Sequence, residues 1–160
     1  LMADLSVTIT ESVVLNNADQ GGTHTLTVSD ITEVFKRIVA VPVSGSGVVT
    51  VLETTGDAAT VVGAGKLIET TIEYGRFTNI GTVDLKFQLA RDDDSNATDD
   101  ECAWFYLEPG KSFVLNKFDA GFDAIAGEAD TPTYDSVTDV RVLNADGSTE
   151  GSLEIFIAST

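Results

Sequence analysis

Residues 68–116, which read IETTIEYGRFTNIGTVDLKFQLARDDDSNATDDECAWFYLEPGKSFVLN, carry the clearest strand patterns in the chain. From 83 to 89, apolar residues at the odd positions alternate with polar ones, which is the two-residue period of a strand with one wet face. Residues 102–107 are apolar on both faces, which predicts a central strand covered on both sides. This stretch therefore predicts a sheet protein.

A turn signal follows the apolar strand. In Glu108-Pro109-Gly110-Lys111, proline presets the backbone of the second position and glycine accepts a positive φ at the third, as a type II turn requires. The turn predicts that residues 112–116 return as the hairpin partner of 102–107.

Strand patterns continue on both sides of this stretch. Alternation between apolar and polar residues recurs at 5–10, 23–28, 137–143 and 153–158, and turn-rich segments separate these runs. The chain of 160 residues has no linker and no internal repeat. We therefore expect one all-β domain over residues 1–160, an antiparallel β-sandwich of nine or ten short strands that resembles a jelly roll.

Two segments leave a choice open. Residues 30–42 match a helix face and begin with a possible capping box, but their β-branched end and the following Ser-Gly loop favour a strand over 35–41, with a helical turn before it and a hairpin return after it. In 68–80, Phe77 has the opposite parity to Ile72 and Tyr74, so we expect a bulge at Gly75 to reset the register.

The charge balance limits the partners. Against 26 Asp and Glu stand 9 Lys and Arg, a formal net charge of −17. Such a surface repels phosphate, so we expect neither a nucleic-acid nor a membrane partner. The first cationic residue is Lys36, and no apolar run near the N-terminus matches a signal peptide, which predicts synthesis in the cytoplasm.

No set of residues predicts catalysis. His24 is the only histidine and stands among threonines, so we interpret it as an ordinary strand residue and expect no enzyme. The single cysteine, Cys102, lies in the most apolar strand and is interpreted as a small core residue. Trp104 and Tyr106 share one face of that strand. Burial in the core is the favoured interpretation, and an exposed platform for sugar is the alternative.

An acidic loop at residues 92–101 is the one candidate cation site. It holds six of the 26 acids, and oxygen ligands at alternate positions are typical of calcium loops, although the later positions break the EF-hand pattern. We expect no cofactor other than this calcium ion. The alternative interpretation is a solvated loop that binds no ion. The candidate ligands are Asp92, Asp94, Asn96, Asp99, Asp100 and Glu101.

The opening MADLSVTITESVVLN (residues 2–16) resembles small acidic virion proteins of tailed phages of aquatic bacteria. Further similarity lies in residues 30–42, 74–79 and 153–159. The resemblance implies a capsid decoration (cement) protein, a jelly roll that clusters as a homo-oligomer, preferably a trimer, on the outside of the head. Its implied location is the virion, and its implied partner is the major capsid protein.

Other roles stay open at this point. They are a tail or fibre component, a carbohydrate-binding module, a subunit that exchanges a terminal strand and, with least support, a hydrolase. For assembly, we expect contacts through the terminal segments 1–16 and 153–160 and through the irregular segment 117–134.

Overall fold

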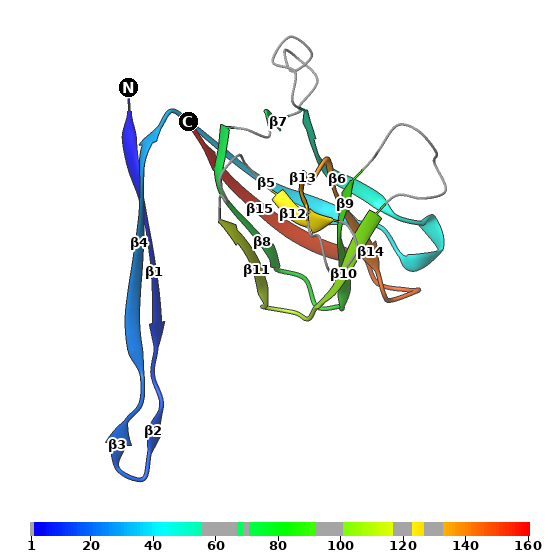
Figure 1. Ribbon diagram of the computed structural model, residues 1–160. Helices are drawn as coiled ribbons and strands as arrows, with labels where there is room; N and C mark the ends of the chain where they lie inside the picture. The colour runs from blue at the N-terminus through cyan, green and yellow to red at the C-terminus, as the bar shows by residue number, and fades with distance from the viewer. Residues whose placement is uncertain (1, 56–66, 69–70, 92–100, 117–122, 127–132) are drawn as a thin grey trace.

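The computed structural model describes residues 2–55, 67–68, 71–91, 101–116, 123–126 and 133–160. These residues form two packed sheets and a long hairpin that projects from them (Figure 1). The fold is nearly all β, and a short 3₁₀ turn lies at Ser44–Ser46. The all-β sandwich predicted from the sequence is confirmed, whereas its jelly-roll character stays a prediction.

The first sheet has five strands in the order β10-β9-β14-β6-β7. Its pairs are antiparallel except for β6 and β7, which run parallel. The strands are β6 (Val49–Thr55), β7 (Leu67–Ile68), β9 (Leu85–Arg91), β10 (Glu101–Leu107) and β14 (Asp139–Asn144).

The second sheet has four antiparallel strands in the order β11-β8-β15-β5. They are β5 (Glu33–Val41), β8 (Ile72–Asn79), β11 (Ser112–Asn116) and β15 (Gly151–Ser159). β12 (Asp123–Ala126) and β13 (Thr133–Ser136) form a separate antiparallel two-stranded sheet.

The core lies between the two sheets. Leu153, Ile155 and Ile157 of β15 are fully buried there, as their alternation predicts, because β15 lies between β5 and β8. A row of aromatic rings crosses from one sheet to the other. Its centroid distances are 4.9 Å for Phe77–Phe87, 5.0 Å for Phe87–Phe113 and 4.7 Å for Phe113–Phe105.

Two turns predicted to close hairpins instead carry the chain between the sheets. The 108–111 turn has the expected geometry, with Gly110 at φ 76° and a hydrogen bond from the Lys111 amide to the Glu108 carbonyl. However, β11 pairs with β8 and not with β10, so the hairpin prediction was wrong. The same holds for β5 and β6, which lie in different sheets. In the first case the rings of Phe105 and Phe113 meet between strands of different sheets, at a centroid distance of 4.7 Å.

Two predictions, one on the start of β5 and one on the bulge in β8, need correction. Residues 35–41 do form a strand, but β5 begins at Glu33, directly after Thr32, so there is no helical turn before it. The bulge in β8 lies between Ile72 and Tyr74 and not at Gly75, since Ala158 pairs with Tyr74 while Ser159 pairs with Ile72. The shift turns Ile72 into the core and Tyr74 to the outer face of the sheet.

The N-terminal hairpin, here called the arm, comprises residues 3–31. It consists of β1 (Ala3–Glu11), β2 (Val14–Leu15), β3 (Ala18–Asp19) and β4 (Gly22–Ile31), with β1 paired to β4 and β2 to β3. The sequence predicted strands over most of β1, β2 and β4, with a turn-rich loop over 16–22, and placed these strands in the sandwich. Figure 1 shows the arm leaving the sandwich near the C-terminus, with its tip far from both sheets.

Candidate functional site

Burial is confined to the base of the arm. Leu5 and Val7 on β1 and Leu26 and Val28 on β4 pack against a small cluster formed by Ile31, Tyr74 and Ala158. These contacts place the arm base on the outer face of the four-stranded sheet. Beyond them, the opposite face of the arm carries threonine pairs, such as Thr8 and Thr25, whose hydroxyl oxygens are 3.2 Å apart.

The tip of the arm, residues 13–18, is apolar and exposed. Val13, Val14 and Leu15 are exposed to 51%, 70% and 61%. Asn16 and Asn17 have φ values of 53° and 61°, the positive values that a tight type I′ hairpin turn requires. The predicted loop over 16–22 is therefore mostly a tight turn and β3. A monomer gains nothing by presenting three aliphatic side chains on a narrow projection, so this surface has the character of a contact site.

A second exposed apolar surface lies on the outer face of the five-stranded sheet. There the interpretation of residues 102–107 as a central covered strand was wrong, because β10 is the edge strand and residues 102–106 are exposed. Cys102 is likewise exposed and not a core residue. Trp104 and Tyr106, exposed to 45% and 65%, share one face of β10, and Phe105 between them is less exposed, at 38%, and contacts the Phe113 ring.

Cross-strand pairing gathers other side chains beside these aromatics. Tyr106 pairs with Lys86, and Lys86 pairs with Leu143 on the next strand. Residues directly opposite on neighbouring antiparallel strands share a face, so the three form a row across the sheet. We call the resulting hollow of about 390 Å³ the aromatic socket; it is lined by Lys86, Trp104, Phe105, Tyr106 and Leu143.

Each of the two sheets carries ion pairs, but Lys86 is not part of one among the described residues. On the four-stranded sheet, Glu154 accepts a hydrogen bond of 2.6 Å from Arg76 and lies 3.3 Å from the Lys36 ammonium. The bond from Arg76, followed by that from Lys36, lowers the pKa of Glu154. On the five-stranded sheet, Arg141 pairs with Asp139 at 2.8 Å. Lys86 takes part in no ion pair with any residue that the structure describes.

A further groove of about 510 Å³ lies where the arm base meets the end of the four-stranded sheet. Asp30 and Glu73 contribute carboxylates to it, and Thr160 donates a 3.3 Å hydrogen bond to Glu73. Its walls belong to the junction that holds the arm.

The remaining sequence-predicted sites have different outcomes. The calcium candidates Asp92, Asp94, Asn96, Asp99 and Asp100 lie outside the described residues, and Glu101 is described only as the first residue of β10. Within the ranges that are described, no three potential ligands gather to hold a metal ion. His24 is an exposed residue of β4, paired with Ile9.

The C-terminal strand β15 lies between β5 and β8, so both of its edges are already paired within its own sheet, and contact through segment 153–160 stays a prediction. In segment 117–134, the side chains, including the two phenylalanines, fall outside what the structure describes. No helix in the described part of the chain is both long and apolar enough to cross a bilayer. Comparisons with protein-family models, with curated proteins and with solved structures found no match.

Proposed function

We propose that this chain is a virion structural protein of a tailed phage, a capsid decoration protein that packs as a homo-oligomer on the outside of the head against the major capsid protein. The resemblance of four segments to such proteins supplies the phage context. The observation that carries an assembly role is the arm, whose apolar tip is covered by nothing in its own sandwich.

The shape of the arm supports assembly in preference to catalysis. Nine residues of β1 span about 30 Å at the usual rise of a strand. An antiparallel pair alone is only marginally stable in water, so an arm of this length gains from contact with a partner. Several copies that engage one shell together multiply weak contacts, which lets an acidic chain hold without strong electrostatic attraction.

The solution experiment shortens the arm and leaves its base intact. Because Thr10 pairs with Thr23, residues 11–22 can be replaced by Asn-Gly, which closes a two-residue hairpin at that pair. We expect the full-length chain to sediment as an oligomer and the short-arm variant as a folded monomer. The control, Asn17→Gly, keeps the tip and suits its positive φ, so it should sediment like the full-length chain.

The place on the particle needs its own measurement. Negative-stain microscopy of purified virions, labelled with antibody against this chain, should show label over the head. Label on the tail would favour a tail or fibre component, and virions that contain the chain nowhere would overturn the proposal.

A carbohydrate-binding module is the second candidate, favoured by the exposure of Trp104 and Tyr106 on one strand face. Exposed aromatic rings can stack on the apolar faces of sugars. In affinity electrophoresis through polysaccharide gels, this candidate predicts retardation that Trp104→Ala removes and that shortening the arm leaves unchanged.

A further inference from the structure

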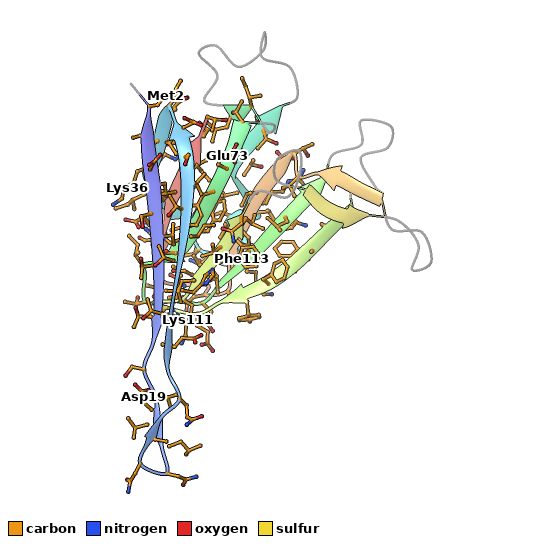
Figure 2. The ribbon with its side chains drawn as sticks, turned by 60° about the vertical axis from the view of Figure 1, so that its left-hand side comes forward. Met2, Asp19, Lys36, Glu73, Lys111 and Phe113 are labelled. Carbon is orange, nitrogen blue, oxygen red and sulfur yellow. The ribbon has the colours of Figure 1, made fainter. Side chains whose placement is uncertain are left out.

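The arm tip and the aromatic socket are two apolar surfaces of one chain that do not meet within it. In Figure 2, Asp19 marks the tip at the far end of the arm, whereas Phe113 lies in the sandwich. Figure 1, from another side, also shows the tip on the side of the molecule away from β10. Each surface is therefore open to a contact from outside.

The two surfaces match in chemistry. The tip offers three aliphatic side chains, and the lining of the socket includes three aromatic residues and Leu143. The socket volume of about 390 Å³ lies in the range of pockets that hold compact apolar groups. Among the described strands β10 has a neighbour on one side only, and such sheet edges readily accept another strand.

They also match in charge. Residues 1–35 contain no Lys or Arg, and two carboxylates, Glu11 and Asp19, flank the tip. In the socket, Lys86 has no ion-pair partner among the described residues. Because the net charge is −17, two copies repel one another except where an acidic surface meets a cation. Lys86 supplies that cation in the socket.

We propose that the arm tip of one copy docks in the aromatic socket of a second copy, with the Lys86 ammonium facing the acids that flank the tip. The inference rests on the proposed homo-oligomeric function and names its contact. Tip and socket are different surfaces, so the interface is heterologous and repeats around a closed ring when its rotation closes.

Substitutions on either side of the contact test the proposal. We expect Leu15→Asp and Trp104→Ala each to weaken self-association at least tenfold in sedimentation equilibrium, because each removes an apolar anchor. The matched control is Val34→Asp on β5, whose valine is as exposed as the tip residues but lies on the other sheet. It should self-associate like the unmodified chain.

The native cysteine provides a direct proximity measurement. Cys102 has the same parity on β10 as Trp104 and is exposed, and Ala18 is an exposed residue of the tip. With Ala18→Cys and oxidised glutathione as oxidant, docking should join the two thiols as a disulfide between chains, while glutathione takes up the electrons and protons. Each chain then carries both partners, so covalent oligomers larger than dimers should form.

Two controls complete the design. Thr8→Cys moves the thiol to the middle of the arm, and Ala18→Cys with Cys102→Ser removes its partner; neither should give the larger covalent oligomers. If the chain stays oligomeric through its arm but Ala18→Cys gives no such products, the socket is not the docking site and the proposed function still stands. If the full-length chain is monomeric throughout, both proposals fail.

Discussion

Asn79 and Asn144 tie the two sheets together in the same way from opposite sides. Asn79, on the four-stranded sheet, donates from Nδ2 to the carbonyl of Leu107 on the five-stranded sheet at 2.8 Å. Asn144, on the five-stranded sheet, donates to the carbonyl of Val41 on the four-stranded sheet at 3.2 Å. Both side chains are fully buried.

Each asparagine also holds its own turn. Asn79 donates a second bond to Val83 and accepts one from the Gly81 amide. Asn144 donates to Thr149 and accepts from the Asp146 amide. The bonds to Leu107 and Val41 are buried, and buried polar groups are normally hydrogen-bonded in this way.

We predict that Asn79→Ala and Asn144→Ala each lower the free energy of unfolding by about 2–3 kcal/mol, the usual cost of buried polar groups that lose their partners. Urea unfolding followed by tryptophan fluorescence measures the change. Asn116→Ala is the matched control, because Asn116 is exposed, and it should change the free energy by less than about 0.5 kcal/mol. Equal effects at buried and exposed positions would contradict the role of the ties.

Acid should destabilise the fold through two carboxylates. Hydrogen bonds from the Ser148 and Thr149 amides, with a smaller one from the Ser148 hydroxyl, lower the pKa of Asp146, and the bonds from Arg76 and Lys36 lower that of Glu154. A lowered pKa in the folded state gives stability that is present above the unfolded-state pKa and lost as pH falls through the folded-state value. We therefore expect the melting temperature to decrease once the pH is lower than about 4, near the ordinary pKa of Asp and Glu side chains.

The variants Asp146→Asn and Glu154→Gln check this assignment. Each should lower the melting temperature at pH 6 and flatten its decline in acid, because the lowered folded-state pKa of the carboxylate is the source of that decline. A decline of unchanged steepness in both variants would assign the acid sensitivity to other groups.

Calcium binding by residues 92–101 remains a prediction from the sequence. Binding that favours the native state must raise the melting temperature, so saturating calcium should raise it in the unmodified chain. The paired variant Asp94→Asn with Asp99→Asn should abolish the rise. Magnesium at the same concentration is the control for simple screening, and equal shifts with both ions would remove the support for a specific site.

The sequence predicted where the strands lie better than it predicted which strands pair with each other. Alternation identified β9 and β15, because one wet face and one buried face leave a period of two, although β9 starts at Leu85 and not at Val83. The Pro109-Gly110 turn was also correct. Its partner strand was wrong, because a tight turn has the same sequence whether it joins strands in one sheet or crosses between two.

The candidate site escaped prediction for a related reason. An apolar run such as 102–106 has the composition of a buried strand, and only the sheet order shows that β10 stands at an edge. The arm strands alternate like sandwich strands, since their inner face does pack at the base. Asn79 and Asn144 are indistinguishable by sequence from asparagines in exposed turns.

The arm base should control the ionisation of Tyr74. Burial raises the pKa of the Tyr74 phenol, although the Arg76 charge opposes the shift. Leu26 and Val7 of the arm pack on the cluster that contains this ring. We therefore predict that Val7→Ser with Leu26→Ser, which loosens the base, moves the pKa of Tyr74 back toward 10. Because the neutral phenol is favoured in the folded state, its contribution to stability is present below the unfolded-state pKa and lost as pH rises through the folded-state value.

Alkaline titration of absorbance near 295 nm measures the change in the pKa of Tyr74, and subtracting the titration of the Tyr74→Phe chain isolates this phenol from Tyr106 and Tyr134. The exposed arm substitution Thr25→Ser is the control and should leave the titration unchanged. If the pKa of Tyr74 is the same with the base loosened, the arm does not cover the ring in solution.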